Sequence, residues 1–285
     1  MKIQHVTVVG AGTMGNGIAQ ACALAGLEVT MIDISAAALE RGLSNISKSL
    51  ERLVQKEKLA ANESERALQR IDTATSYKAL RAPQLVIEAA TENIEVKLRI
   101  LRDVEAAVPK DTVIATNTSS ISITQLAAVL DRPSRCIGLH FFNPVAVMDL
   151  LEVIRGLQTS DETHATALAF ARTIGKTPIS VMSSPGFVVN RILCPMINEA
   201  IFVLQERLAS PEEIDTGMKL GCNHPIGPLA LADLIGLDTM LAVMRVFHES
   251  FGDPKYRPAP LLKEMVDAGR LGRKSGQGFF SYGPN

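Results

Sequence analysis

Residues 5–15 read HVTVVGAGTMG, a β-rich apolar run followed by three closely spaced glycines. The run HVTVV predicts a buried strand that enters a tight turn at Gly10. The residues that follow, MGNGIAQACALA (14–25), are apolar and rich in alanine, and they predict a helix that ends at Gly26. A strand, a glycine turn and a helix in this order indicate the start of a sheet in which strands and helices alternate.

The glycine turn fits the pattern G-x-G-x-x-G, whose members are Gly10, Ala11, Gly12, Thr13, Met14 and Gly15. The pattern alone is weak, because glycines cluster in many loops. Its context is specific, because it joins a strand to a helix and Asp33 closes the next strand-like run about 20 residues further on. We therefore predict a dinucleotide-binding loop, in which backbone amides at the start of the helix face the pyrophosphate.

Asp33 indicates which dinucleotide this loop binds. A carboxylate at this position accepts hydrogen bonds from the adenosine ribose and repels a 2′-phosphate. No arginine follows Asp33 closely in the sequence IDISAAALER (32–41) to bind such a phosphate. The sequence therefore predicts NAD, in preference to NADP, as the cofactor.

Strand-like and helical patterns alternate along the chain as far as Met182. After EVTMID (28–33), the strand-like runs are QLVIEA (84–89), TVIATN (112–117), CIGLHF (136–141), DLLEVI (149–154) and TPISVM (177–182). A charged helical stretch from Ser35 to about Arg70 is longer than one crossover needs, so we expect a helical hairpin that protrudes from the fold.

Beyond the linker-like SSPGF (183–187) the pattern is helical only. One helix there is expected to begin after Ser210, with Pro211 at its first position. The predicted fold class is α/β. It combines a doubly wound, Rossmann-type sheet with a helical hairpin insertion over residues 1–184 and an all-α domain over residues 185–285.

Composition and charge argue against several classes of function. The net charge is −1, so no basic field would hold nucleic acid. The apolar runs are too short to cross a bilayer and the N-terminus has no signal-peptide pattern, so we expect a cytoplasmic protein. The cysteines lack metal-ligand spacing, and we expect them to be small buried thiols with no metal; they are Cys22, Cys136, Cys194 and Cys222.

Residues 140–152, HFFNPVAVMDLLE, place a histidine and a glutamate at the ends of an apolar stretch with an Asn-Pro break. If the strands on either side of the break pair antiparallel, His140 and Glu152 lie equally far from Ala146 and on one face of the sheet. A carboxylate beside an imidazole fixes one tautomer and supports a general base. A core histidine satisfied by a carboxylate fits this pattern equally well.

Polar residues elsewhere favour the catalytic interpretation. Thr116–Ser120 (TNTSS) follows a predicted strand, at the carboxyl edge where open α/β sheets bind ligands. Asn190 opens the first helix of the second domain and could face the same cleft. Ser119 or Ser120 could instead cap the helix ISITQLAAVL (121–130).

Several longer motifs resemble one enzyme family. They are GAGTMGNGIAQ (10–20), IEAATEN (87–93), ATNTSSISIT (115–124), GLHFFNPVAVMDLLEVI (138–154), SPGFVVNRILCPMINEA (184–200) and GCNHPIGPLALADLIGLD (221–238). Together they resemble the 3-hydroxyacyl-CoA dehydrogenase family over essentially the whole chain. The bacterial 3-hydroxybutyryl-CoA dehydrogenases are the nearest type.

The resemblance implies roles for individual residues. It implies that His140 takes the hydroxyl proton of the substrate while hydride passes to the nicotinamide, and that Glu152 orients this histidine. Positions that hydrogen-bond substrate oxygens or grip coenzyme A match Ser119, Asn190, Ser49 and Lys56. Cofactor contacts match Glu92, Lys97, Asn117, Ser119, Asn143 and Lys274. The resemblance also implies an acyl-CoA substrate and a homodimer formed mostly by the C-terminal domain.

Two other functions remain open at this point. One is another NAD-dependent hydroxyacid or polyol dehydrogenase with the same two-domain plan. The segment Ser49–Lys56 favours an acyl-CoA, because a nucleotide handle needs surface beyond a small-acid pocket. The other is a non-catalytic NAD-binding protein, since a fold does not determine a function.

Asp33→Ala is predicted to narrow the discrimination between NAD and NADP, because the change removes the carboxylate that repels the 2′-phosphate. Steady-state kinetics with both cofactors measure the ratio of catalytic efficiencies. An unchanged ratio would refute the assignment of Asp33 to the ribose.

Overall fold

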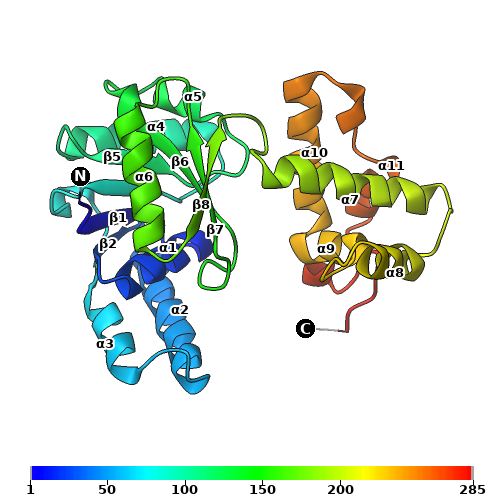
Figure 1. Ribbon diagram of the computed structural model, residues 1–285, viewed down its shortest axis with the longest axis horizontal. Helices are drawn as coiled ribbons and strands as arrows, with labels where there is room; N and C mark the ends of the chain where they lie inside the picture. The colour runs from blue at the N-terminus through cyan, green and yellow to red at the C-terminus, as the bar shows by residue number, and fades with distance from the viewer. Residues whose placement is uncertain (1, 284–285) are drawn as a thin grey trace. The chain divides into compact units, whose positions relative to one another are not determined.

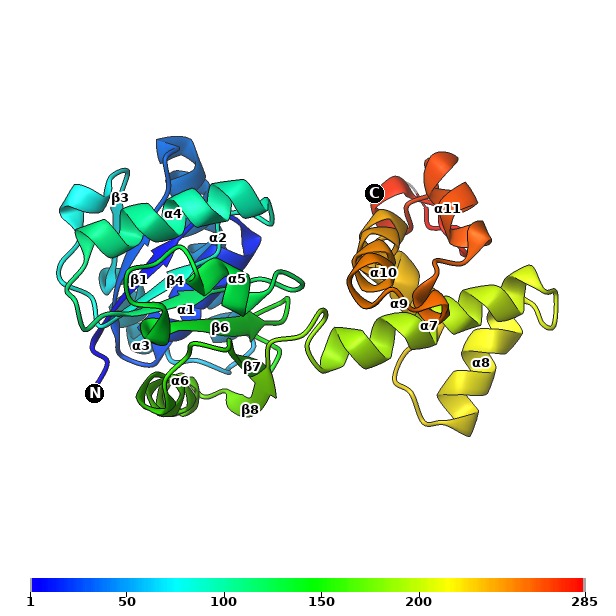
Figure 2. The same ribbon diagram turned by 90° about the horizontal axis from the view of Figure 1, so that it is seen from above.

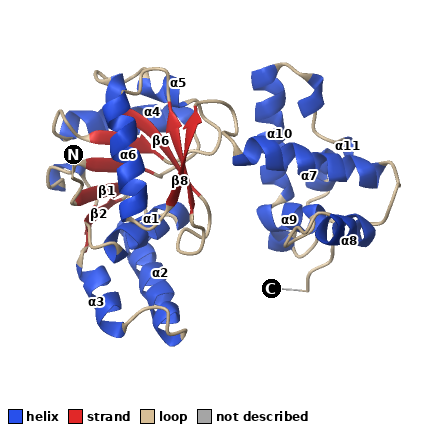
Figure 3. Ribbon diagram, in the orientation of Figure 1, coloured by secondary structure: helices blue, strands red, loops and turns tan. Residues whose placement is uncertain are grey.

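The computed structural model describes residues 2–283, and it divides the chain into two compact units with the boundary between Ser184 and Pro185 (Figure 1). The first unit holds a sheet covered by helices, and the second unit holds helices and loops (Figure 3). The predicted fold class is confirmed: the first unit is Rossmann-like and the second is helical.

Within the described residues the sheet has eight strands in the order β3-β2-β1-β4-β5-β6-β7-β8. Their bounds are β1 His5–Val9, β2 Glu28–Ile32, β3 Ile71–Ala74, β4 Leu85–Glu88, β5 Val113–Thr116, β6 Cys136–Phe141, β7 Leu150–Arg155 and β8 Thr177–Met182. All neighbouring strands pair parallel except β6 and β7, which pair antiparallel. The carboxyl ends of β1, β2, β4, β5 and β6 therefore share one edge of the sheet.

The strand β3 was not predicted. Its sequence, IDTA, carries no apolar run, and within it only Ile71 is buried. It is an edge strand that pairs with β2 alone, so it needs no second apolar face. Its backbone hydrogen bonds to β2, which depend on tertiary context, define it more than its side chains do.

Helices cover both faces of the sheet, as a doubly wound fold requires. The helices of the first unit are α1 Thr13–Leu24, α2 Ala36–Gln55, α3 Ala61–Gln69, α4 Ile94–Ala107, α5 Ile123–Ala127 and α6 Asp161–Thr173, with short 3-10 turns η1 Tyr77–Ala79 and η2 Pro133–Arg135. Residues of α1, α2, α3 and α6 join one hydrophobic core with the sheet. Figure 2 shows α4 on the other side of the sheet from α6.

The expected helical hairpin is the pair α2 and α3. Ser35 caps α2, since its hydroxyl oxygen accepts a hydrogen bond from the backbone N–H of Ala38. Leu39, Ile46 and Leu50 form the buried stripe of α2. Both helices contact α1, and the pair extends away from the sheet (Figure 1).

The second unit is built from α7 Val189–Gln205, α8 Pro211–Gly221, α9 Pro228–Ile235, α10 Leu237–Phe251 and α11 Pro260–Asp267, with 3-10 turns η3 Pro254–Tyr256 and η4 Arg273–Ser275. These helices enclose a separate core that includes Ile197, Met240 and Phe247. The predicted start of α8 is confirmed, because Ser210 caps the helix and Pro211 is its first residue.

Candidate active site

The glycine loop between β1 and α1 adopts the geometry that a dinucleotide needs. Gly10 has φ +105°, and a Cβ there would lie 2.6 Å from the carbonyl oxygen of Ala89. A Cβ at Gly15 would collide with the carbonyl oxygen of Gly10. A Cβ at Gly12 would meet nothing within 4 Å. The structure itself therefore requires two of the three glycines, while Gly12 keeps space open in front of the loop.

The start of α1 fits a bound pyrophosphate. Gly12 is the N-cap residue and supplies no side-chain cap, and the first turn contains no acidic residue. The first N–H groups of a helix have no partner within the helix and carry the positive end of its dipole. A phosphate accepts hydrogen bonds from these N–H groups, and its negative charge is favoured by the helix dipole. The loop therefore fits the diphosphate of a dinucleotide.

Asp33 follows β2 and connects the glycine loop to the loop between β2 and α2. Its Oδ2 accepts a hydrogen bond from the N–H of Ala11 at 2.9 Å, and its Oδ1 accepts one from the N–H of Ser35 at 3.0 Å. Each carboxylate oxygen has a second lone pair, so contact with a ribose remains compatible with these bonds. Asp33 also shapes the loop, a role that the sequence did not indicate.

His140 and Glu152 meet as the sequence predicts. They are directly opposite in the antiparallel register of β6 and β7, and Nδ1 of His140 lies 2.6 Å from Oε2 of Glu152. Glu152 is fully buried, while His140 is 7% exposed. Because a carboxylate can only accept, Nδ1 carries the shared hydrogen, and the tautomer and the ring orientation are set together.

The loop between β6 and β7 is held by a buried lysine. Nζ of Lys176 donates hydrogen bonds to the carbonyl oxygens of Val145 at 2.6 Å and Met148 at 2.8 Å. Burial lowers the pKa of this amine, and the nearby Asp149 partly opposes the shift. The two hydrogen bonds fix the hairpin loop whose strands carry His140 and Glu152.

Polar residues after β4 and β5 form a second cluster at the carboxyl edge. Oε1 of Glu92 accepts hydrogen bonds from the N–H of Ser119 at 2.8 Å and from its hydroxyl at 3.1 Å. Oε2 of Glu92 accepts one from the hydroxyl of Thr118 at 2.8 Å. The hydroxyl hydrogen of Ser119 is thus engaged, and its oxygen retains acceptor capacity. The alternative role of Ser119 or Ser120 as a helix cap is wrong, because Ser122 caps α5.

Asn117 connects this cluster to the histidine. Its Oδ1 accepts a hydrogen bond from the N–H of Phe141 at 3.0 Å, one residue after His140. Its own N–H donates to the carbonyl oxygen of Glu88 at 2.7 Å. The side chain of Asn117 therefore fixes the end of β6. Its predicted contact with the cofactor remains a prediction.

Lys97 lies deeper than the sequence suggests. The side chain has no exposed surface, and its Nζ donates to Oε2 of Glu88 at 2.5 Å. The predicted contact between Lys97 and the cofactor remains a prediction. Glu88 was not among the predicted site residues. A charged residue that closes the apolar run LVIE is a signal for it, because a buried carboxylate requires a partner.

The remaining predicted site residues lie further out or in the second unit. Asn143 is exposed in the loop after β6, Ser49 is half-buried on α2, and Lys56 is exposed at the end of that helix. Asn190 lies in the first turn of α7. Their contacts with substrate or cofactor remain predictions.

Lys274 forms an ion pair inside the second unit. Its Nζ lies 2.5 Å from Oδ1 and 2.7 Å from Oδ2 of Asp238, at the start of α10. This contact lowers the pKa of the Asp238 carboxyl group. The ion pair gives Lys274 a partner within the second unit, and its predicted contact with the cofactor remains a prediction.

The cysteines differ in one respect from the expectation. Cys22, Cys136 and Cys194 are buried, and burial raises the pKa of each thiol to about 12. Cys222 is exposed, so the expectation of a buried thiol is wrong there. It follows the last turn of α8, where the helix ends at the surface.

Within residues 2–283 no group of three or more His, Cys, Asp or Glu side chains could hold a metal ion. In the same part of the chain no helix is long and apolar enough to span a membrane.

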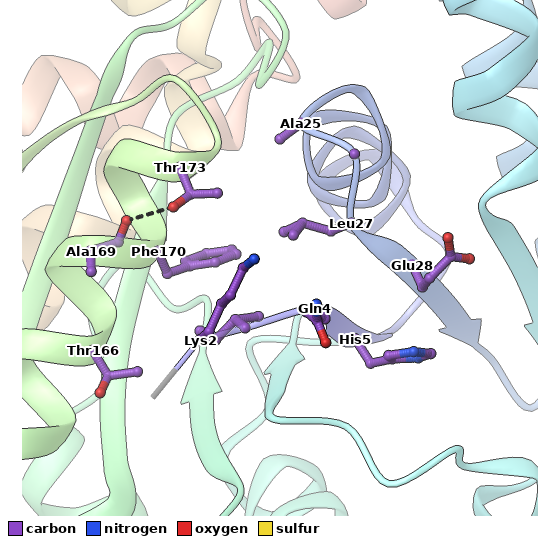
Figure 4. Close-up of a pocket in the computed structure, with 12 residues that line it drawn as sticks. Lys2, Gln4, His5, Ala25, Leu27, Glu28, Thr166, Ala169, Phe170 and Thr173 are labelled. Carbon is purple, nitrogen blue, oxygen red and sulfur yellow. Dashed lines mark hydrogen bonds between the residues drawn. The ribbon is translucent and has the colours of Figure 1, made fainter.

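A cavity of about 690 Å³ lies at the opposite edge of the sheet (Figure 4). It is lined by the amino ends of β1 and β2 and by α6, and Phe170 and Leu27 form part of its apolar wall. The glycine loop, His140 and Ser119 do not line it. The cavity is therefore separate from the candidate active site, which gathers at the carboxyl ends of the strands.

The chain matches two family models that together cover nearly its whole length. Residues 5–184 match the 3-hydroxyacyl-CoA dehydrogenase, NAD binding domain, and residues 186–282 match the C-terminal domain of the same enzymes. The chain belongs to the 3-hydroxyacyl-CoA dehydrogenase family. It is an NAD-dependent dehydrogenase, and the cofactor predicted from the glycine loop and Asp33 is confirmed.

Individual members of the 3-hydroxyacyl-CoA dehydrogenase family are similar over their full length. A probable 3-hydroxybutyryl-CoA dehydrogenase of Bacillus subtilis is 50% identical over 282 residues, which cover 99% of this chain and 98% of the relative. A 3-hydroxybutyryl-CoA dehydrogenase of Bradyrhizobium diazoefficiens is 49% identical, with coverage of 98% and 96%. The crystal structure of (S)-3-hydroxybutyryl-CoA dehydrogenase from Ralstonia eutropha is 63% identical, with a TM-score of 0.97 and coverage of 99% and 100%.

Gly12→Ala is predicted to weaken NADH binding by about tenfold or more while the fold stays intact. The added methyl group meets no protein atom within 4 Å, but it occupies the space that the diphosphate needs. NADH fluorescence titration measures the dissociation constant, and thermal unfolding measures stability.

Gly217→Ala in α8 is the matched control, because its Cβ also meets nothing within 4 Å. We expect unchanged NADH binding and a gain in stability of up to about 1 kcal/mol. Equal NADH affinity in both variants would contradict the assignment of the glycine loop.

Proposed function

We propose that the protein interconverts (S)-3-hydroxybutyryl-CoA, or a similar short-chain 3-hydroxyacyl-CoA, and acetoacetyl-CoA with NAD(H). The observation that carries the proposal is the buried pair of His140 and Glu152 at the edge of the sheet that also carries the glycine loop. The names of the relatives with 49–63% identity support the choice of substrate.

His140 is the general base in the proposed oxidation. Glu152 accepts a hydrogen bond from Nδ1–H, so Nε2 is the ring nitrogen that takes the hydroxyl proton of the substrate. When the ring becomes positively charged, the carboxylate of Glu152 compensates that charge. NAD⁺, when bound, supplies the hydride acceptor. In the reverse direction the imidazolium returns the proton to the same oxygen.

Other residues hold the substrate in place for this proton transfer. Ser119 is proposed to donate to the reacting substrate oxygen by turning its hydroxyl hydrogen away from Oε1 of Glu92. Asn190 offers an amide that can donate to a second substrate oxygen. Ser49 and Lys56, on α2 and at its end, are proposed to bind the coenzyme A portion, with Lys56 facing a phosphate. Correct orientation of this kind supplies much of an enzyme's rate acceleration.

We also propose a homodimer that forms through the second unit. This unit exposes several large apolar side chains, among them Ile192, Leu208, Leu220 and Leu234. Burying exposed apolar side chains away from water is favourable, which supports a partner on this unit. A second copy of the chain that covers these side chains would remove them from water.

A comparison of two substrates tests the proposed activity. NADH oxidation is followed at constant enzyme concentration with acetoacetyl-CoA and with free acetoacetate. We expect the catalytic efficiency with the thioester to be higher by about 100-fold or more, because binding energy from a remote handle contributes to catalysis. Comparable efficiencies would point to a small hydroxyacid dehydrogenase instead.

His140→Gln is predicted to lower kcat by about 10²–10⁴, since that is the usual contribution of a general base. Glu152→Gln keeps a hydrogen-bond acceptor but loses the charge, and we expect a loss of about 10–100-fold. Stopped-flow or steady-state assays with acetoacetyl-CoA measure both effects, and NADH titration checks that cofactor binding persists.

Glu105→Gln is the matched control for Glu152→Gln. The carboxylate of Glu105 accepts hydrogen bonds from the N–H groups of Asp131 and Arg132, away from the proposed site. The kcat of Glu105→Gln should stay within about twofold of the kcat of the unmodified enzyme. Near-normal turnover of His140→Gln would exclude His140 as the base.

A further inference from the structure

A charged pair of Glu88 and Lys97 lies buried near the loops that surround His140. Glu88 ends β4, Thr116 ends β5 beside it in register, and Lys97 reaches them from α4. Oε2 of Glu88 accepts hydrogen bonds from Nζ of Lys97 at 2.5 Å and from the hydroxyl of Thr116 at 2.7 Å. All three side chains have no exposed surface. The proposed mechanism uses none of them.

The first outward connection of this cluster leads to the cofactor loop. Oε1 of Glu88 accepts a hydrogen bond from the N–H of Ala90 at 2.9 Å and thereby fixes the turn after β4. That turn packs directly on the glycine loop: a Cβ at Gly10 would lie 2.6 Å from the carbonyl oxygen of Ala89. The same turn continues to Glu92, which holds Ser119. A shift at Glu88 would therefore move both the cofactor loop and Ser119.

The second outward connection leads to the histidine. Nζ of Lys97 lies 3.4 Å from the carbonyl oxygen of Asn117, and the N–H of Asn117 donates to the carbonyl oxygen of Glu88. Oδ1 of Asn117 in turn accepts from the N–H of Phe141, next to His140. The cluster thus contacts both backbone polar groups of Asn117, the residue whose side chain fixes the end of β6.

We infer that Glu88, Lys97 and Thr116 are positioning residues for the dehydrogenase reaction. This inference rests on the proposed role of His140. The cluster sets the relative positions of the glycine loop, Ser119 and the end of β6 that carries His140, and it acts on the substrate only through these neighbours. A misplacement of about 1 Å at this distance from the chemistry can reduce the rate about 100-fold.

A purely stabilising role explains the cluster less well. A buried ion pair loses so much hydration that apolar side chains of similar volume often stabilise a fold equally well. Directly before β5, a neutral hydrogen bond satisfies the buried polar groups: the hydroxyl of Thr112 donates to the carbonyl oxygen of Pro83 at 2.7 Å. The charged cluster of Glu88, Lys97 and Thr116 occurs instead at the carboxyl edge of the sheet, where the proposed ligand-binding loops meet.

Thr116 and Thr112 provide a matched pair of substitutions. Both are buried threonines, Thr112 directly before β5 and Thr116 at its end, and each donates one hydrogen bond of 2.7 Å. Thr116 differs in that it also accepts a hydrogen bond from Nζ of Lys97 at 3.3 Å. Thr116→Val and Thr112→Val each remove a single hydroxyl group at constant shape. We expect Thr116→Val to lower kcat by about tenfold or more, with KM for acetoacetyl-CoA changed less than threefold. Thr112→Val should keep kcat within twofold.

Hydrogen exchange provides a readout that does not depend on turnover. In Thr116→Val the amides of residues 89–93 and 117–121 should exchange faster, while the rest of β5 keeps its protection. In Thr112→Val these segments should exchange as in the unmodified protein. An enzyme without activity on acetoacetyl-CoA would refute the proposed function, and the exchange experiment would still test the positioning role.

A double substitution, Glu88→Leu with Lys97→Met, removes the charges together and avoids an unpaired buried ion. We expect this variant to fold and to lose at least as much kcat as Thr116→Val. Equal kcat in Thr116→Val and Thr112→Val, or normal kcat in a folded double variant, would overturn the inference.

Discussion

The antiparallel register between β6 and β7 is the constraint on which the candidate site depends. In an otherwise parallel sheet this single reversal brings Glu152 directly opposite His140. Side chains opposite each other on one face of a pleated sheet are close enough to hydrogen-bond. The parallel neighbours add the glycine loop and the polar loops at the same edge, so local strand geometry assembles groups that are distant in sequence.

Two buried side-chain pairs lie at this edge and differ in their access to solvent. The pair of Glu152 and His140 keeps a small opening to the outside, which a group that exchanges protons requires. The pair of Glu88 and Lys97 has no exposed surface, and its other partners are the hydroxyl of Thr116 and backbone groups. Burial makes each interaction directional and strong, and it also makes an unpaired member costly. The first pair is therefore slightly accessible at its histidine, while protein atoms enclose the second pair on all sides.

Much of this organisation follows from local sequence, and the rest does not. The glycine loop, Asp33 and the hairpin of His140 and Glu152 could be predicted, because turn geometry and strand periodicity act over short distances. The partners of Glu88 could not, since Thr116 lies 28 residues away and contacts it through sheet pairing. The strand β3 and the ion pair of Lys274 with Asp238 were missed for the same reason: tertiary neighbours define them, and no local pattern does.

Lys176 adds a consequence for how this protein can vary. Its single Nζ holds the carbonyl groups of Val145 and Met148 in the turn between β6 and β7, so one atom ties these two positions of the turn together. A change in turn length that slid β7 by one residue along β6 would direct its glutamate to the opposite face of the sheet. The turn should therefore tolerate changes of side chain more readily than changes of length.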